Sequence, residues 1–472
     1  MPGTAPATPL ASAPGGFRQN SCCGACIAVA AAVLTACGAA SSTVATPTAQ
    51  SRPPDVERES FAVADAPDPP LLGVGEWLDP RLRSVQFTGG GAELQDPIVP
   101  LDGAVVLTFD WLEDDDVRDF RYDVIHCDRD WRPDRLPTMD YLATFSEGDI
   151  RDFRLSVTAK VPYVSYRLQL PNQDVAWTVS GNYLLRLYDD DTGELVARLR
   201  FCVHEGLLFP DPLVRRPVQA QLDRTHQEFF ASVNVREGRI ENPRRSLTLS
   251  VTQNGDWRYT IPNLPVRSVR GEDVLWDYPG KIVFPGHREW RNLDLRTLRS
   301  DGGQVAEVAE EETGITAYLL PDRYRVDEAD EVRIDVNGKF VLDDFDNRLG
   351  GRSEYATVLF SLRSERDESI EPLYLYGALN GYALSEANRG VYNDLTRSYV
   401  FRALLRQGFY EYAYVSLADA PRFPSWSEVE GNTFAAENHY NFLVYYRPYG
   451  ARFDRLVGYR FEQVNPTGAT AR

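Results

Sequence analysis

Short β-rich runs, separated by Asp, Gly, Asn and Pro, constrain the fold of this chain more than any other feature. In the runs 104–110, 120–126 and 164–170, apolar and polar residues alternate with a period of two, as in a strand with one buried face. No long run has the periodicity of a helix. The chain also has 24 Tyr and 22 Phe but only 2 Met, and aromatic residues pack well on pleated sheets. We therefore expect an all-β protein.

The clearest hairpin joins residues 183–188 to residues 195–201, because Gly193 between them can adopt the positive φ that the turn requires. About seven such strands occupy the region 80–206, a density typical of an immunoglobulin-like or fibronectin-like β-sandwich. We expect tandem sandwiches of this kind, of which residues 80–206 form the first.

The remaining chain divides at a Pro-rich step, residues 209–212, which resembles a linker. A middle β domain is expected over 213–315, with the charged stretch 302–314 bulging into solvent. A C-terminal β-sandwich is expected over 316–462. Further strands are predicted at 229–235, 246–252, 355–362, 373–376, 399–405 and 410–415.

Residues 1–36 have the pattern of a lipoprotein signal peptide. They contain no acidic residue, and the apolar run from Cys26 is too short to span a bilayer as an anchor. Leu34-Thr35-Ala36-Cys37 is similar to the lipobox of bacterial lipoproteins, so Cys37 is the expected lipidation site, carrying diacylglycerol and palmitate. The alternative is an ordinary signal peptide with an incidental Cys.

Residues 37–79 follow as an expected lipidated, disordered tether, because small polar residues cannot bury enough surface to fold. Gly38 stands where many inner-membrane lipoproteins carry Asp, so we expect the protein in the periplasm, anchored to the inner leaflet of the outer membrane only through its lipid. An oxidising periplasm would permit a disulfide between Cys127 and Cys202, but two buried thiols are the alternative.

The net charge of −19 disfavours nucleic acid as a partner, because a negative protein repels phosphate backbones. No metal-ligand, nucleophile-elbow or nucleotide-binding motif stands in the chain after Cys37. His126 and Cys127 are adjacent and would point to opposite faces of a strand. The acidic runs 113–116, 189–191 and 343–346 suit solvated turns better than Ca²⁺ sites. We expect no catalytic residue, metal or cofactor.

One pattern suggests ligand recognition. Residues 373–380 read as a strand followed by a Gly-x-x-Asn turn, and residues 407–414 as a Gly followed by a Tyr-rich strand. This resembles the early-set sandwich of carbohydrate-binding modules, in which aromatic residues stack on sugars. The C-terminal domain is therefore expected to be early-set-like, with packing of the same aromatic residues in a core as the alternative.

A second resemblance covers the chain from about residue 80 to residue 460. It rests on the following segments, which stand in the same order as in the plug protein family of the bacterial type IX secretion system: Tyr122–Trp131, Ser180–Tyr183, Arg200–Val203, Gln253–Trp257, Tyr278–Phe284, Asn292–Arg299, Gln407–Tyr412, Glu430–Asn432, Glu437-Asn438 and Val444–Arg447. The resemblance implies a non-enzymatic periplasmic protein that binds the outer-membrane translocon barrel and closes its pore.

Three functions therefore compete at this point: the secretion-pore plug, a lipid-anchored carbohydrate-binding protein, and a periplasmic chaperone that captures strands at its sheet edges. We expect Trp131, Trp257 and Tyr183 to be structural residues, because each stands at the edge of a strand-like run.

Overall fold

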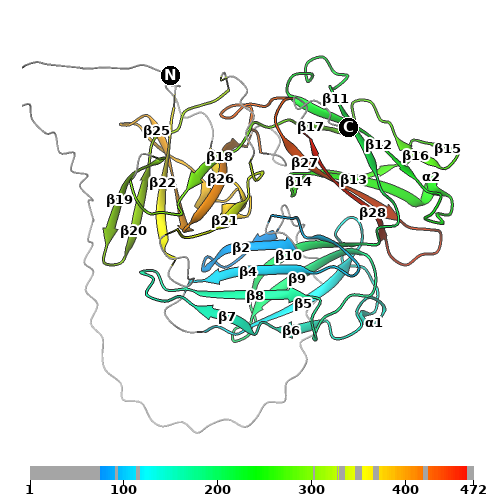
Figure 1. Cartoon of the computed structure of the whole chain (residues 1–472), viewed down its shortest axis with the longest axis horizontal. Coiled ribbons are helices and arrows are strands. Elements are labelled where there is room, and N and C mark those ends of the chain that lie inside the picture. The colour runs from blue at the N-terminus through cyan, green and yellow to red at the C-terminus, as the bar shows by residue number, and fades with distance from the viewer. Residues whose placement is uncertain are drawn as a thin grey trace, which may run out of the picture. The chain divides into compact units, whose positions relative to one another are not determined.

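The computed structural model describes residues 75–90, 94–112, 117–300, 303–326, 328, 335–345, 353–364, 372–417 and 424–464. These residues form six β-sheets with very little helix, and nearly all strand pairs are antiparallel. The expected all-β class is confirmed at this level. The sheets associate in three pairs, each enclosing a hydrophobic core, which we call the first, second and third sheet pair (Figure 1).

The first sheet pair lies between Gly75 and His204. One sheet has the order β1-β10-β9-β5-β6, with β3 beside β10, and the other the order β2-β4-β8-β7. The bounds are β1 Gly75–Trp77, β2 Leu82–Gly89, β3 Ile98–Pro100, β4 Val105–Trp111, β5 Phe120–Cys127, α1 Thr138–Tyr141, β6 Glu147–Asp149, β7 Asp152–Leu155, β8 Val164–Leu170, β9 Gly181–Asp189 and β10 Leu195–His204. Alternate residues of β8 enter the core, as the period of two predicts.

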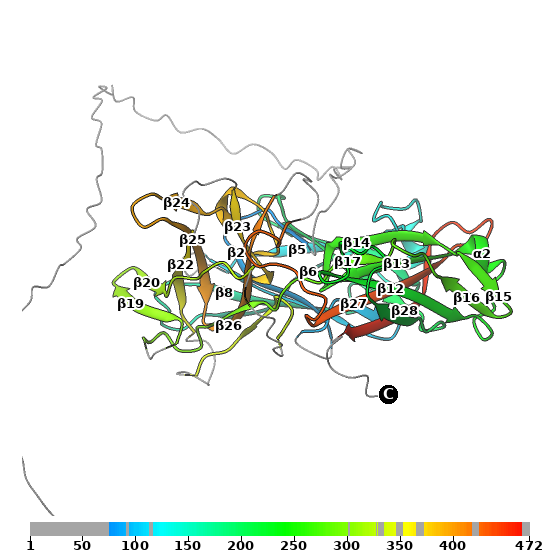
Figure 2. The ribbon, with the colours of Figure 1, turned by 90° about the horizontal axis from the view of Figure 1, so that it is seen from above.

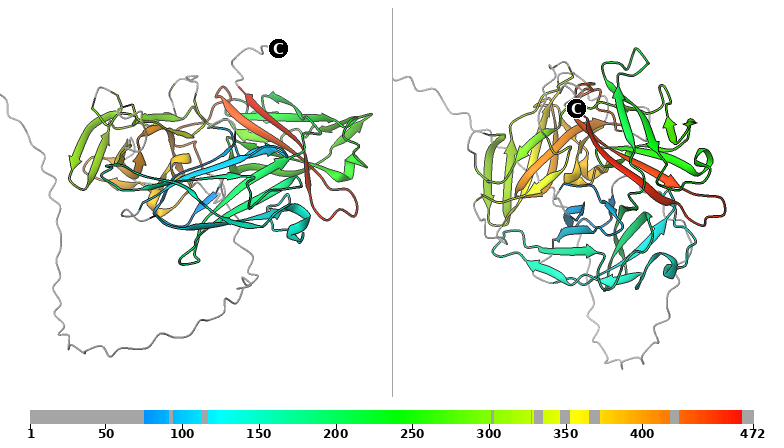
Figure 3. Two further views of the ribbon diagram at one scale, coloured as in Figure 1. Left: turned by 60° about the horizontal axis from the view of Figure 1, so that its bottom comes forward. Right: turned by 45° about the vertical axis from the view of Figure 1, so that its right-hand side comes forward.

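The second sheet pair combines strands that are far apart in the sequence. One sheet has the order β11-β12-β16-β15, with β17 beside β12, and the other the order β14-β13-β27-β28. The bounds are β11 Asp211–Arg215, β12 His226–Asn234, α2 Pro243–Ser246, β13 Leu247–Gln253, β14 Asp256–Pro265, β15 Ser268–Arg270, β16 Asp273–Trp276, β17 Val283–Pro285, β27 Asn438–Tyr446 and β28 Arg455–Val464. Figure 3 shows the red C-terminal strands beside the green strands of this pair.

The third sheet pair contains the sheet β18-β26-β21, with β23 beside β26, and the sheet β19-β20-β22-β25-β24 (Figure 2). The bounds are β18 Arg291–Asp294, β19 Val305–Glu311, β20 Gly314–Leu319, β21 Phe340–Leu342, β22 Tyr355–Arg363, β23 Leu373–Tyr376, η1 Ala378–Asn380, η2 Glu386–Asn388, β24 Val391–Asn393, β25 Ser398–Arg406 and β26 Gly408–Ser416. The 3-10 helix η1 follows β23 after Gly377, and the 3-10 helix η2 lies between η1 and β24.

The strand pairing differs from the expected boundaries at 213–315 and 316–462. Strand β27, expected in the C-terminal domain, pairs through Tyr440–Tyr446 with the whole of β13, and Tyr440, Phe442 and Val444 complete the second core. Strand β18, expected in the middle domain, pairs with β26 of the third pair. The physical reason is burial: β13 and β27 are buried at every position, so each needs a neighbouring strand on both sides.

Two further expectations can be compared with the structure. Within the charged stretch expected to bulge, residues 305–314 form β19 and the turn to β20, with most of β19 exposed at the edge of its sheet. Cys127 and Cys202 are both buried and free, so the thiol alternative holds and the disulfide does not form. Across the described residues, we find no helix with the length and apolar character that a membrane span requires.

Candidate functional site

Asp96 connects all three sheet pairs. It lies in the turn between β2 and β3 of the first pair, where its carboxylate accepts hydrogen bonds from Lys339 Nζ at 2.7 Å, His439 Nε2 at 3.1 Å and Asn441 Nδ2 at 2.7 Å. Lys339 immediately precedes β21 of the third pair, whereas the other two donors lie on β27 of the second pair. We call Asp96, Lys339, His439 and Asn441 the junction.

The junction is buried and electrostatically matched. Burial alone would raise the pKa of Asp96, but the neighbouring Lys339 and His439 outweigh it and hold this pKa far below the usual value. Gly255 follows β13 with φ of +70°, and a Cβ there would lie 2.5 Å from Asp96 Oδ1. Glycine is therefore required at position 255 both by the backbone conformation and by the close approach of the carboxylate.

A cavity of about 70 Å³ lies beside the junction, and residues of all three sheet pairs line it. They include Trp77, Asn254 and Tyr382. Liquid water takes about 30 Å³ per molecule, and small-molecule sites usually measure about 300 Å³ or more. This cavity therefore suits one or two water molecules and not a substrate.

A second buried contact joins the first pair to the third. Asp110 on β4 accepts hydrogen bonds from Ser165 Oγ at 2.6 Å, Tyr355 OH at 2.7 Å and Arg406 Nη1 at 3.0 Å. Tyr355 and Arg406 belong to β22 and β25 of the third pair, whereas Ser165 is on the neighbouring strand β8. The ionised carboxylate is thus held by a guanidinium and two hydroxyl groups, which offset the cost of burying it.

The first and second pairs meet in a mixed aromatic and polar contact. Trp131 and Trp257 pack edge to face with ring centroids 4.7 Å apart, and the Arg200 guanidinium lies 4.8 Å from the Trp131 ring. Tyr445 OH donates to Asn182 Oδ1 at 2.8 Å. The two tryptophans therefore have the expected structural role, and Tyr183 is fully buried in the first core.

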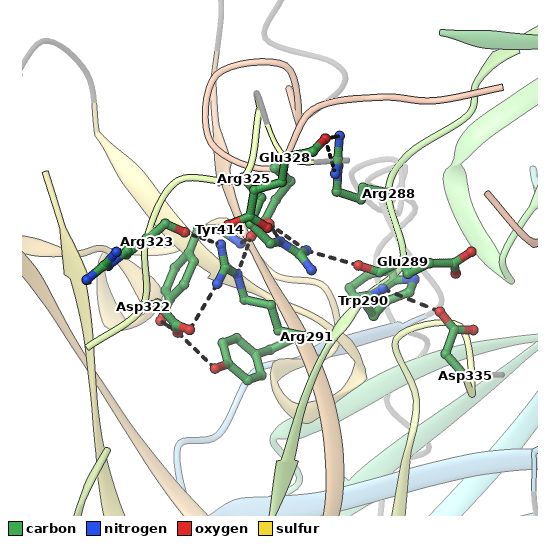
Figure 4. A network of polar contacts seen from close by, with 12 residues as sticks. Arg288, Glu289, Trp290, Arg291, Asp322, Arg323, Arg325, Glu328, Asp335 and Tyr414 are labelled. Atoms are coloured by element: carbon green, nitrogen blue, oxygen red, sulfur yellow. Dashed lines mark hydrogen bonds and ion pairs between the residues drawn. The ribbon is translucent and has the colours of Figure 1, made fainter. Parts of the chain in front are cut away.

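Within the third pair, Glu430 binds a polar network whose members Arg291, Asp322, Arg325 and Tyr414 are labelled in Figure 4. Its carboxylate pairs with Arg291 Nε at 2.9 Å and with Arg325 Nη2 at 2.6 Å, and it accepts a hydrogen bond from Tyr414 N at 2.9 Å. Arg291 also pairs with Asp322 at 2.9 Å. Burial opposes ionisation of Glu430, but Arg291 and Arg325 hold its pKa at about 2. The network ties the segment before β27 to β18 and to the chain after β20.

Two nearby carboxyl groups, those of Glu289 and Glu411, have raised pKa values, in contrast to Glu430. Burial, reinforced by Asp335, raises the pKa of Glu289 and of Glu411 to about 8 in each case. Glu411 accepts hydrogen bonds from Val336 N and Gly338 N, and Glu289 accepts one from Glu437 N at 3.0 Å. These groups hold protons at neutral pH, when free carboxyl groups have lost theirs.

We expect the protons on Glu289 and Glu411 to make the free energy of unfolding fall as the pH rises from about 4.3 to about 8. The folded state keeps these protons up to a pKa of about 8, whereas the unfolded chain releases them above its ordinary pKa of about 4.3, so the stability that they contribute declines across this range and the slope levels off above it. Denaturant titration at several pH values measures the slope. Glu289→Gln, which mimics the protonated side chain, should reduce it; an unchanged slope would contradict the assignment.

Other sequence-predicted positions have structural surroundings. Cys37 and the acidic run 113–116 lie outside the described residues. His126 is buried, with Nδ1 bonded to Asp134, and does not act on Cys127. Asp189 caps its own turn and pairs with Arg118, and Asp344 contacts Gln407. Among the described residues, no group of three or more His, Cys, Asp or Glu side chains is placed to hold a metal ion.

The aromatic residues of the early-set pattern pack in a core. Asn380 Nδ2 donates to Leu375 O at 2.7 Å and closes the turn after β23. Tyr374, Tyr376 and Tyr382 are buried in a cluster with Trp290 and Trp426, and a Cβ at Gly381 would collide with the Trp77 ring. These tyrosines therefore offer no exposed platform for a sugar, and the core alternative holds for them.

The sequence reasoning missed the junction. Asp96 stands in an ordinary Asp-Pro turn, and His439 has no metal-like spacing. Lys339 did carry a signal, because it is one of only three lysines in the chain. Nothing in the local pattern shows that these residues meet, since they are more than 240 positions apart from Asp96 in the sequence.

The comparison with protein families bears on the first sheet pair. Residues 82–205 match the family model described as the type 9 secretion system plug protein first domain. These residues are similar to a plug protein first domain. The matched segment runs from β2 to the end of β10, so it covers nearly all of the first sheet pair, including Asp96 and Asp110. The resemblance noted in the sequence is confirmed over these residues.

The rest of the chain also has a structural relative. A hypothetical protein from Parabacteroides merdae, solved at 2.30 Å resolution, is 26% identical with a TM-score of 0.78, covering 84% of this chain and 100% of that one. The C-terminal domain of the Streptococcus pyogenes antigen I/II-family protein AspA is 7% identical with a TM-score of 0.14, covering 81% and 99%, and supports no argument. No curated protein matches the chain.

Proposed function

We propose that this protein is a non-enzymatic component of the type IX secretion system that binds the periplasmic side of the outer-membrane translocon barrel and seals its pore. The observation that carries the proposal is the match of residues 82–205 to the plug protein first domain. The partner in this proposal is the translocon barrel, and the protein contacts the membrane only through a lipid anchor.

The contacts among the three sheet pairs support a sealing role. A barrel wide enough for folded cargo leaks unless its closure is broad and rigid, and a rigid partner loses little conformational entropy on docking. Asp96 and Asp110 are buried, hydrogen-bonded carboxylates that fix the first pair to the other two. Such contacts resist hinge motion between the sheet pairs.

We further propose that the three sheet pairs are immunoglobulin-like or fibronectin-like sandwiches, with the third early-set-like. Within this proposal the second domain is discontinuous. It begins near residue 211 and is completed by residues 438–464, which surround the third domain in the sequence. Because the C-terminal hairpin returns to the second domain, both ends of the third domain are held at the second domain, which makes the connection between the two more rigid.

Lipidation at Cys37 places the protein at the outer membrane in this proposal, with residues 1–36 removed and residues 37–79 as the tether. Replacing Cys37→Ser is expected to release the protein from membranes in cell fractionation, because the anchor thiol is lost. Metabolic labelling with palmitate should mark the wild type and not the variant. A variant that stays in the membrane fraction after high-salt washing, with an unlabelled wild type, would contradict lipidation.

Purification of the tagged, full-length protein from its native outer membrane in mild detergent tests the partner. We expect recovery of a very large outer-membrane barrel in stoichiometric amount, through an interface burying more than about 1,000 Å². Recovery of polysaccharide without a barrel would favour the carbohydrate-binding function, although the burial of Tyr374, Tyr376 and Tyr382 argues against it. Recovery of neither would contradict both.

A further inference from the structure

Strand β7 forms an open edge of the first sheet pair. It pairs with β8 on one side, and no strand of the described residues pairs with its other side. All four of its residues are exposed. Open edges with long apolar side chains tend to pair with other strands unless they are blocked.

The orientation of the free backbone groups follows from the register. Ser156 N donates to Tyr163 O at 2.9 Å, two positions beyond the β7–β8 pair of Arg154 with Ser165. Hydrogen-bonded positions alternate in an antiparallel ladder, so Arg154 turns its backbone groups toward β8. Phe153 and Leu155 therefore direct their N–H and C=O groups outward, to the open edge.

The side chains along this edge are apolar and exposed. Phe153 and Leu155 have 42% and 50% of their surfaces exposed, at alternate positions of β7. This spacing places them on one face, beside the free backbone groups of the same strand. Val157, which is 50% exposed, follows after the strand has ended. An extended peptide with apolar residues at alternate positions would cover Phe153 and Leu155.

Arginines flank the same edge and lack carboxylate partners. Arg154 is exposed, Arg167 contacts only Gln169 Oε1 at 3.1 Å, and no Asp or Glu of the described residues lies within ion-pair distance of either guanidinium. Both line a cavity of about 380 Å³ next to β7, whose lining also includes Asp152 and the ion pair of Arg406 with Asp110. In a chain of net charge −19, two guanidinium groups without a carboxylate at ion-pair distance favour an acidic group.

We propose that β7 is the translocon-docking edge: an extended, carboxylate-bearing segment of the translocon adds to the sheet as a strand beside β7 and places its acidic side chain near Arg154 and Arg167. This inference rests on the proposed function. Backbone hydrogen bonds along the edge supply affinity, while the apolar face and the arginines select the sequence that binds.

The test compares variants of the full-length protein during purification of the native complex. Leu155→Pro removes an outward N–H without removing a bond to β8, whereas the control Leu155→Ala keeps that N–H. We expect Leu155→Pro to reduce barrel recovery about tenfold and Leu155→Ala about threefold or less. Arg154→Glu should also reduce recovery about tenfold, unlike Arg270→Glu at an exposed arginine on β15.

A photo-cross-linking residue gives a second readout that does not depend on variant stability. Placed at Phe153, it should cross-link to the barrel, whereas at Leu395, which is 96% exposed on another hairpin, it should not. If the wild type recovers the barrel but Leu155→Pro and Arg154→Glu match their controls, and Phe153 gives no cross-link, the docking edge is wrong and the plug function stands. If the wild type itself recovers no barrel, the result contradicts the proposed function and not only the docking edge.

Discussion

Replacing Asp96→Ala is expected to lower the free energy of unfolding by about 3–5 kcal/mol, among the largest effects of any single change in this chain. The substitution leaves the partly buried Lys339 without its carboxylate partner and removes the acceptor for His439 and Asn441 at the same time. Denaturant titration of the folded body measures the loss.

The matched control for Asp96 is an ion pair at the surface. Glu386 pairs with Arg389 at 3.2 Å, with both side chains largely exposed, so Glu386→Ala should change stability by less than about 1 kcal/mol. Similar small losses for both variants would contradict the view that the junction holds the three sheet pairs together.

Replacing Glu430→Ala is expected to cost a similar amount, about 3–5 kcal/mol, for a related reason. The fully buried carboxylate holds two guanidinium groups, and its removal leaves Arg325 without an ion pair while Arg291 keeps only Asp322. The wild-type pKa of about 2 also predicts that Glu430 contributes stability above pH 4.5 that is lost only as the pH falls toward 2.

The control for Glu430 removes a carboxylate from an ion pair that is only partly buried. Glu462 on β28 pairs with Arg460 at 3.0 Å near the surface, and Glu462→Ala should cost less than about 1 kcal/mol. A loss at Glu430 no greater than that at Glu462 would show that the buried network does not stabilise the third sheet pair.

Local patterns predicted the strands well and their partners poorly. The runs at 164–170 and 373–376 became β8 and β23 with the same bounds, because alternation and β-propensity are properties of the segment itself. Which strands pair with one another depends instead on burial between segments that are far apart in the sequence. Every residue of β27 is buried between β13 and β28, so its sequence has no polar face to show where it belongs.

The candidate site was even harder to predict than the strand partners, because its residues are far apart in the sequence. The Tyr-rich run 410–414 is predicted as a strand, and Tyr412 and Tyr414 in it donate hydrogen bonds to Asp322. Nothing in the sequence around these tyrosines indicates that Asp322 is their partner. The motif Glu430-Gly-Asn432 was singled out only by its resemblance to a family, yet its carboxylate binds Arg291, Arg325 and the backbone of Tyr414. Buried ion pairs of this kind join segments whose individual sequences look like solvated loops.

The most direct test of the central claim is the permeability of the outer membrane. Deletion of the gene should admit large antibiotics in a strain that assembles the translocon barrel, because the leak runs through the unsealed pore. Deletion in a strain without the barrel should leave permeability unchanged, and secretion should persist at least partly in the first strain, since a plug opposes passage. Wild-type permeability in the deletion strain, with the translocon assembled, would contradict the plug function.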